Sequence, residues 1–238
     1  MLKVASYNIR KALGTDRRRS PDRIIEVLND VGADIIALQE ADRRFGKRTA
    51  VLSDFLLEHH TPWRAVPLGV RTESMGWHGN ALLIRRDHEL IAHDLIHLPC
   101  LEARGAVTAT VRVGDMTVRI VGMHLDLSGL WRRRQASALV HYLDQPQLAP
   151  VDATILMGDL NEWSAARGCL QDFTRSFQLA TCGRSYHATR PIAMLDRILW
   201  RGALSMAASG VHQSAAARRA SDHLPIWAQF EAAPAPAP

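Results

Sequence analysis

The sequence predicts an α/β chain in which two packed β-sheets carry helices on their outer faces. Three observations predict this arrangement. The first forty residues read as strand, helix and strand, a tight hairpin joins two strands in the middle of the chain, and a second long helix is again followed by strands. A sheet or helix must bury its apolar face against another layer, and two sheets packed together with helices outside satisfy every such face.

The opening unit reads as a strand, a helix and a second strand. Residues 2–9 alternate like a strand and carry Asn8 near its end. The Ser-Pro-Asp sequence at 20–22 predicts a helix start, and Gly32 ends the apolar repeat that follows. The next apolar run ends in Glu40. If the two strands are parallel neighbours, Asn8 and Glu40 reach the same sheet edge, where ligand sites usually lie.

The remaining elements follow from apolar periodicity and turn residues. They are expected as a helix over 50–59, strands over 63–67, 81–85, 91–98, 106–113 and 116–124, a helix over 130–143, a strand over 154–157, and a short helix that starts at 164–167. Gly114 and Asp115 supply the hairpin turn. Two apolar runs close the fold, one opened by Asp196 and one preceded by Asp222 and His223.

Composition is that of an ordinary globular chain. The 238 residues are 47% hydrophobic and 22% charged, which suffices for a substantial core. We expect one catalytic domain over residues 1–231 and a disordered Pro/Ala tail over 232–238. The net charge of +5 fits a phosphorylated or polyanionic partner. A monomer is assumed.

The cysteines and the hydropathy bear on location. Cys100, Cys169 and Cys182 are odd in number and form no metal-type cluster, which argues against a disulfide scaffold. A reducing, cytoplasmic location is therefore expected. No apolar run approaches the length of a membrane span, so no transmembrane segment is expected.

Polar residues recur at the expected strand ends in five short stretches. These are Tyr7-Asn8-Ile9, Leu38-Gln39-Glu40, Gly158-Asp159-Leu160-Asn161, Leu195-Asp196-Arg197-Ile198 and Ser221-Asp222-His223-Leu224-Pro225. A carboxylate that orients an imidazole, beside a second carboxylate free to hold a metal, is what water activation requires. The five stretches therefore mark a candidate hydrolytic site.

In this order, over roughly residues 2–230, the five stretches resemble the endonuclease/exonuclease/phosphatase superfamily. That superfamily includes DNase I-like nucleases, AP endonucleases, neutral sphingomyelinases, inositol polyphosphate phosphatases and deadenylases. The resemblance implies a DNase I-like, four-layered α/β sandwich of two packed mixed β-sheets flanked by helices. It also implies metal-dependent hydrolysis of phosphoesters.

The resemblance assigns metal-side roles to three residues. Glu40 matches the acidic ligand of the principal Mg²⁺ (or Mn²⁺), and Asn8 matches the residue beside that metal, which helps to hold Glu40, metal or phosphate. Asp222 matches a further carboxylate on the metal side. Oxygen ligands suit such hard cations, and substrate phosphate and water complete the octahedron.

It assigns catalytic roles to the residues of the later stretches. His223 matches the histidine that contacts the phosphate and is often assigned as base, with Asp196 as its orienting partner. Asp159 matches the acid that positions the attacking water or holds a second metal, and Asn161 matches an amide donor to the phosphate. His124 matches the histidine that some members place near the leaving oxygen.

Two further residues are secondary candidates for substrate contact. Asn80 lies in a Gly-Asn-Ala stretch seen in several members, and Arg104 lies in a loop before a strand, where it could clamp phosphate. The sequence at 122–125, Gly-Met-His-Leu, replaces a Tyr-x-x-Asn element of AP endonucleases. This difference argues against abasic-site repair.

The main hypothesis is therefore a phosphodiesterase that uses Mg²⁺ or Mn²⁺ and in-line attack by an activated water. Its substrate would be a phosphodiester, either a nucleic acid or a phospholipid headgroup or other small molecule. One alternative is a phosphomonoesterase that acts on sugar or inositol phosphates. Another is a non-catalytic binding scaffold of the same fold, against which the complete set of acids and histidines argues.

Overall fold

The computed structural model describes residues 1–43, 49–68 and 73–233. The first sheet has the strand order β11-β12-β1-β2-β4-β3 and comprises β1 (Leu2–Asn8), β2 (Ile35–Gln39), β3 (Trp63–Ala65), β4 (Ala81–Arg85), β11 (Leu204–Val211) and β12 (Ile226–Ala232). The second has the order β5-β6-β7-β8-β10-β9 and comprises β5 (Glu89–Ile96), β6 (Gly105–Val113), β7 (Met116–His124), β8 (Ala153–Asp159), β9 (Gln178–Leu179) and β10 (Asp196–Gly202).

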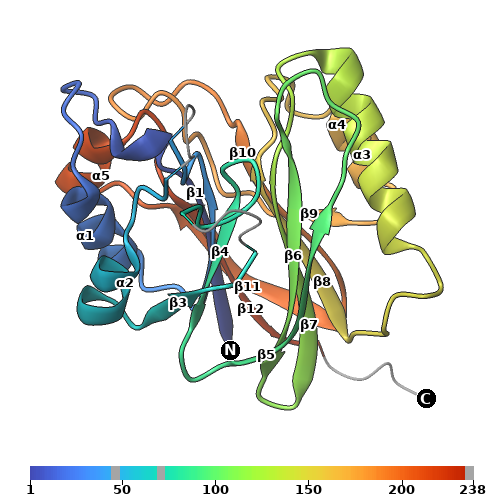
Figure 1. Cartoon of the computed structure of the whole chain (residues 1–238). Helices are drawn as coiled ribbons and strands as arrows, with labels where there is room; N and C mark the ends of the chain where they lie inside the picture. Colours follow the sequence, from blue (N-terminus) through green and yellow to red (C-terminus); the bar gives the residue numbers. More distant parts are fainter. Residues whose placement is uncertain (44–48, 69–72, 234–238) are drawn as a thin grey trace.

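The helices lie on the two outer faces of this pair of sheets. They are a 3-10 turn, η1 (Arg10–Ala12), and the α-helices α1 (Pro21–Val31), α2 (Asp54–His60), α3 (Gly129–Leu143), α4 (Cys169–Phe173) and α5 (Ala215–Ala220). Figure 1 shows α1, α2 and α5 on the side of the first sheet and α3 and α4 on the side of the second. The four-layered sandwich of two mixed sheets flanked by helices is confirmed.

Three apolar layers hold the four structural layers together. One joins α1 to the first sheet through side chains such as Ile24, Leu28 and Ile36. The middle layer lies between the sheets, and a third packs Leu139 and Phe173 against the second sheet. The central strands are buried on both faces, which explains why they read as nearly continuous apolar runs.

Each sheet contains one central parallel pair, and these pairs position the candidate site. β1 and β2 run parallel, with Asn8 opposite Gln39, and β7 and β8 run parallel, with His124 opposite Asp159. β10 is antiparallel to β8 and starts with Asp196 opposite Asp159. The expectation that Asn8 and Glu40 reach one sheet edge is confirmed, and in Figure 1 this edge lies at the top.

The first helix forms as its sequence signals predict. Ser20 caps it, because its hydroxyl accepts a hydrogen bond from the backbone N–H of Arg23. Pro21 occupies the first turn, where no backbone donor is required. Gly32 closes the helix with a left-handed φ of 56°, and its N–H donates to the carbonyl of Leu28.

The prediction that a short helix starts at 164–167 is wrong. The hydroxyl of Ser164 accepts from the N–H groups of Ala166 and Arg167, which forms a local turn, and α4 begins only after Gly168. The elements β9, β11 and α5 were not expected, and α2 begins four residues later than expected.

The expected tail begins inside the fold. Ala232 is the last residue of β12, and the N–H of Ala233 donates to the carbonyl of Ala203, whereas residues 234–238 lie outside the described part. All three cysteines are free thiols. Within the described ranges no helix combines the length and the apolar character needed to cross a bilayer.

Candidate active site

The candidate site lies where strand ends of the two sheets meet. Asn8, at the end of β1, donates its side-chain amide to Asp159 Oδ2 over 3.0 Å, which links the first sheet to the second. Its Oδ1 accepts the N–H of Arg10 at 3.1 Å. The hydroxyl of Ser221 donates to the carbonyl of Asn8 at 2.7 Å and so fixes the loop before β12 against β1. Residues separated by up to 213 positions thus share one site.

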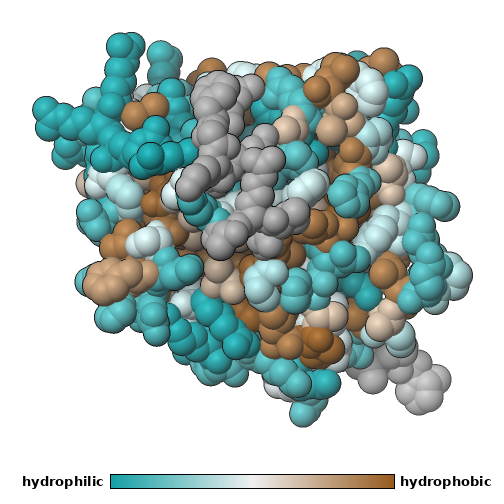
Figure 2. All heavy atoms as spheres, viewed as in Figure 1, coloured by the Kyte–Doolittle hydropathy of each residue, from teal (hydrophilic) through white to brown (hydrophobic). Residues whose placement is uncertain are grey.

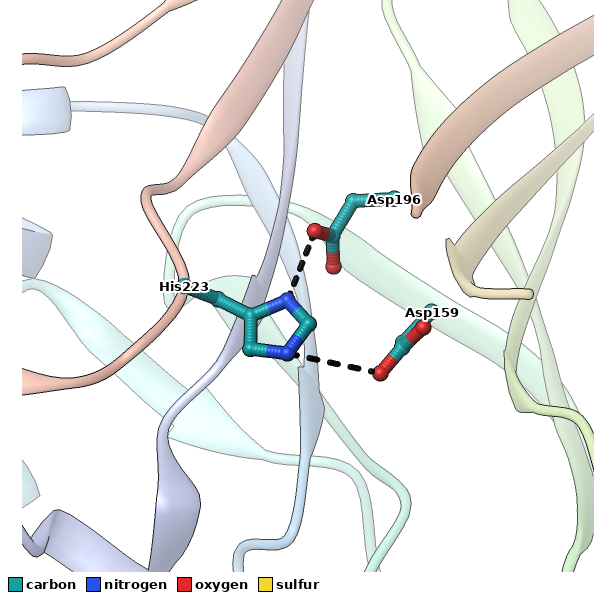
Figure 3. A group of neighbouring side chains, drawn as sticks. All are labelled: Asp159, Asp196 and His223. Atoms are coloured by element: carbon teal, nitrogen blue, oxygen red, sulfur yellow. Dashed lines mark hydrogen bonds and ion pairs between the residues drawn. The ribbon is translucent and has the colours of Figure 1, made fainter. Parts of the chain in front are cut away.

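His223 lies between two carboxylates (Figure 3). Its Nδ1 donates to Asp196 Oδ2 at 2.8 Å, and its Nε2 lies 3.7 Å from Asp159 Oδ2. Ser185 also donates to Asp196 Oδ2. Burial alone would lower the pKa of His223, but the charges of Asp196 and Asp159 outweigh it and raise the pKa to about 9. The imidazole is therefore a cation at neutral pH.

Asp159 is the point at which most of the site contacts meet. Besides Asn8 and His223, it accepts the N–H of Asn161 at 2.9 Å, and His124 Nε2 lies 3.4 Å from its Oδ2. Burial acts to raise the pKa of Asp159, but the two imidazoles and the backbone donor lower it well below its usual range. This carboxylate stays ionised while it is almost completely buried.

His124 and Arg104 form the other side of the site. His124 is the last residue of β7, and burial lowers its pKa despite the neighbouring Asp159, so the ring is neutral at pH 7. The guanidinium of Arg104 contacts His124 Nε2 and forms an ion pair with Glu102 at 3.3 Å. A fixed cation therefore lies beside a neutral imidazole.

Glu40 and Asp222 are paired with two cations that lie two and three residues after Asn8. The ammonium of Lys11 contacts Glu40 Oε2, and Arg10 Nε lies 3.2 Å from Asp222 Oδ2. Arg10, Lys11 and Glu40 all adopt left-handed backbone conformations, with φ of 45°, 57° and 54°. Such φ values are uncommon for residues other than glycine and concentrate at functional sites.

Sequence reasoning missed Arg10 and Lys11 as site residues. Their position two and three residues after Asn8, in a basic stretch, was the available signal. Ser185 and Tyr186 were also missed, although Ser185 contacts Asp196 and the ring of Tyr186 lies 4.9 Å from that of His223. No short motif marks these two positions.

A pocket opens beside Glu40 and runs to the His124 side of the site. Among its lining residues are Lys11, Glu40, His78, Arg104 and His124. Three acids, Glu40, Asp42 and Glu102, thus face the same space as these cationic or neutral nitrogen groups. An anion that binds a metal through its oxygens would find both charge and donors there.

Two of the expected substrate contacts are used for internal hydrogen bonds. The side-chain amide of Asn161 donates to the carbonyl of Leu125 at 2.9 Å, and its backbone has a φ of 50°. Asn80 is fully buried and donates to the carbonyl of Gly105 at 3.1 Å. Asn161 still lies at the site edge beside Asp159, whereas the position of Asn80 gives no support to a contact with substrate.

The acids suit a hard divalent cation. Asp159, Asp196 and His223 have ligand atoms within 4.8 Å of one another, but the hydrogen bonds given above already engage His223 with Asp196. Glu40 and Asp222 keep partly exposed carboxylates, with side chains 26% and 18% exposed, and Asn8 adds an amide oxygen. Carboxylate and amide oxygens are the donors that Mg²⁺ and Mn²⁺ prefer, so this set fits such an ion.

Solved structures of other proteins share the fold of this chain. A Bacteroides thetaiotaomicron mannosyl-6-phosphatase has a TM-score of 0.75 at 17% identity, covering 97% of this chain and 100% of that one. The human Nocturnin catalytic domain with bound sulfate gives 0.73 at 21%, covering 97% and 94%. D. rerio TDP2 complexed with a single-strand DNA product gives 0.72 at 16%, covering 97% and 98%.

The sequence comparisons assign the family. No curated protein sequence matches the chain. The model of the Endonuclease/Exonuclease/phosphatase family, in contrast, matches residues 5–223, a range that includes every strand-end residue of the site from Asn8 to His223. The chain therefore belongs to the endonuclease/exonuclease/phosphatase family.

Proposed function

We propose that this chain is a divalent-metal-dependent phosphodiester hydrolase. One observation carries the proposal: the ionised Asp159 lies between a cationic His223 and a neutral His124, beside the pocket that Glu40 and Arg104 line. The site thus combines a base, cationic donors and a metal-type carboxylate within one small region. Family membership and the phosphoester-related neighbours agree with this class of reaction.

The metal would be held by Glu40, with Asn8 and Asp222 on the same side of the site. When bound, Mg²⁺ or Mn²⁺ would neutralise charge on the phosphoryl oxygens and so reduce their repulsion of the nucleophile. Arg10 and Lys11 hold the two carboxylates from the opposite direction. These cations lie where the non-bridging oxygens of an anionic substrate would also bind.

Asp159 is the group best suited to orient the attacking water and accept its proton. Its lowered pKa keeps it ionised, and its contacts with Asn8 and Asn161 fix its direction. His223, in contrast, already carries a proton, which favours a contact with the phosphate over the role of base. Asp196 stabilises this cation and fixes the ring.

The leaving group would depart on the side of His124 and Arg104. Water adds to phosphorus as Asp159 takes one of its protons, the bond from phosphorus to the alcohol oxygen breaks, and that oxygen takes up a proton from solvent water. The guanidinium of Arg104 stabilises the charge that develops on it. Asn161 can donate its remaining amide hydrogen to a non-bridging oxygen.

The test is hydrolysis of bis-p-nitrophenyl phosphate and p-nitrophenyl phosphate with Mg²⁺, Mn²⁺ or EDTA. We expect metal-dependent turnover that favours the diester and falls at least about a hundredfold in Glu40→Ala and His223→Ala. Glu89→Ala and His93→Ala, which remove an exposed acid and histidine from β5, are matched controls. Preference for the monoester would instead establish the phosphomonoesterase, and no metal-dependent turnover would establish the binding scaffold. The monomeric state and cytoplasmic location stay predictions.

A further inference from the structure

Exposed apolar side chains gather on the loops around the candidate site. Of the eight large apolar side chains that are exposed among the described residues, four lie on these loops and a fifth lies in the first turn of α3, each between 59% and 65% exposed. We call them the apolar rim: Leu101, Leu127, Leu130, Trp163 and Ile192. Figure 2 shows apolar side chains along the corresponding upper edge, over the second sheet and α3. Clusters of this kind on an otherwise polar surface mark interaction sites.

Polar contacts beneath the rim join its loops to one another. The N–H of Leu101 donates to Asp126 Oδ2 at 3.0 Å, and Asp126 directly precedes Leu127. The carbonyl of Leu127 accepts from the guanidinium of Arg132, which pairs with the buried Glu162 at 3.4 Å. Three separate loops are therefore held in fixed positions by side chains that are themselves buried.

The rim continues from Glu162 to the active site. Trp163 follows Glu162, and its ring lies 6.0 Å from that of Tyr186. The carbonyl of Tyr186 accepts the N–H of Ile192 at 2.7 Å, and the ring of Tyr186 lies 4.9 Å from that of His223. The rim therefore extends to the aromatic ring that lies beside His223 in the site.

The hydrogen bonds beneath the rim also allow it to enter an apolar medium. Unpaired backbone groups are costly to bury in hydrocarbon. The N–H groups of Leu101 and Ile192 and the carbonyl of Leu127 already have partners within the chain. The apolar tips can thus leave water while these backbone groups stay paired.

Exposed arginines follow or precede the rim residues on the same segments. Arg134 lies one helical turn after Leu130, Arg167 lies four residues after Trp163, and Arg190 lies two residues before Ile192. The neighbouring acids Asp126 and Glu162 are buried and hydrogen-bonded, and the partly exposed Glu102, which follows Leu101, forms an ion pair with Arg104. The rim therefore presents hydrocarbon and positive charge together.

This combination selects one kind of partner. A single-stranded nucleic acid binds mainly through bases stacked on aromatic rings, whereas four of the five rim side chains are aliphatic and offer no such face. Apolar side chains interleaved with cations are instead typical of proteins that lie on anionic membranes. We propose that the apolar rim docks on an anionic phospholipid bilayer and so presents a lipid phosphodiester to the site, an inference that rests on the proposed function.

The test measures binding of the full chain to vesicles of phosphatidylglycerol and phosphatidylcholine, mixed one to one, by co-sedimentation. We expect binding that falls at least about tenfold in the Leu127→Ser, Leu130→Ser double variant, because two apolar side chains no longer leave water. Replacing Arg134 or Arg167 with Gln should weaken it by about fivefold for each arginine. Pure phosphatidylcholine vesicles should bind more weakly than the mixture.

Phe55→Ser is the matched control. Phe55 is 62% exposed, like the rim residues, but lies on α2 in the opposite helix layer. The Phe55→Ser variant should bind vesicles as the unmodified chain does. The ratio of vesicle-lipid hydrolysis to soluble-diester hydrolysis should fall only in the Leu127→Ser, Leu130→Ser variant. Equal losses in both variants would overturn the proposal, because they would indicate non-specific adsorption.

The outcomes separate this inference from the proposed function. Diester hydrolysis by a chain that does not bind vesicles would overturn the docking and keep the hydrolase. Rim-dependent vesicle binding without hydrolysis of any diester would keep the docking and overturn the hydrolase. Binding of oligothymidylate that is lost in Trp163→Ser, with no vesicle binding, would assign the rim to nucleic acid and overturn the proposal.

Discussion

Removing the charge of Asp196 should change the protonation of His223 while the shape of the site is kept. In Asp196→Asn the carboxylate 2.8 Å from His223 Nδ1 becomes a neutral amide. Burial, which lowers the pKa of His223, is then opposed by the more distant Asp159 at 3.7 Å and by Asp222. We expect the pKa of His223 to fall from about 9 to near or below its ordinary value of about 6.5.

The magnitude follows from the two pKa values. At pH 7.5 nearly all His223 is protonated with a pKa of about 9, whereas roughly a tenth is protonated with a pKa of about 6.5. A histidine whose pKa is raised by folding adds stability below its unfolded pKa and loses that contribution as pH rises through the folded value. A fall of the pKa from about 9 to about 6.5 corresponds to on the order of 3 kcal/mol, and this is the contribution that Asp196→Asn should remove.

Urea denaturation and NMR titration of the histidines check this reasoning. The difference in unfolding free energy between the unmodified chain and Asp196→Asn should be largest below pH 6.5 and shrink by about 3 kcal/mol by pH 10. Asp30→Asn is the control, because Asp30 lies 3.8 Å from His212, whose pKa burial lowers, and it should show no such pH dependence. A pH-independent difference, or a His223 that titrates near 6.5 in the unmodified chain, would refute the reasoning.

Three further outcomes are expected. Diester hydrolysis should fall as pH rises through about 9, where His223 loses its proton; a rate that keeps rising to pH 10 would contradict a cationic role. Gly158→Ala should destabilise the chain by about 1–3 kcal/mol in urea, because its Cβ would lie 1.9 Å from a backbone oxygen of β7. Arg132→Met should lower the free energy of unfolding by roughly 3 kcal/mol, because it leaves the buried Glu162 without its cation. Arg133→Met, on the exposed side of α3, should change the free energy of unfolding by about 0.5 kcal/mol or less. Equal losses in the two variants would contradict this reasoning.

Much of the fold could be predicted because its central strands carry clear local signals. The parallel pairing of β1 with β2 follows from a capped helix between two apolar runs, and by placing Asn8 opposite Gln39 it brings Asn8 and Glu40 to one sheet edge as expected. The hairpin at Gly114 joins β6 to β7 as expected, with Val113 opposite Met116. In these segments local preference and tertiary packing agree.

Other features depend on contacts that no short stretch encodes. β11 pairs only with β12 among the described strands, and its alternation of small and polar residues resembles a loop. Asn80 carries the residue type of a phosphate donor, yet it is buried against Gly105 because the start of β4 packs on β6. The pairing of Lys11 with Glu40 depends on two left-handed residues in separate loops. Periodicity cannot reveal such long-range geometry.

The link between Asn8 and Asp159 divides the chemistry between the two halves of the chain. Cutting the exposed loop between α3 and β8, near residue 147, would leave Asn8, Glu40 and His124 on one fragment and Asp159, Asp196 and His223 on the other. Neither fragment alone would contain Asp159 together with Glu40. Complementation of the separated fragments would thus report reassembly of the β-sandwich, because turnover could return only when the two pieces associate.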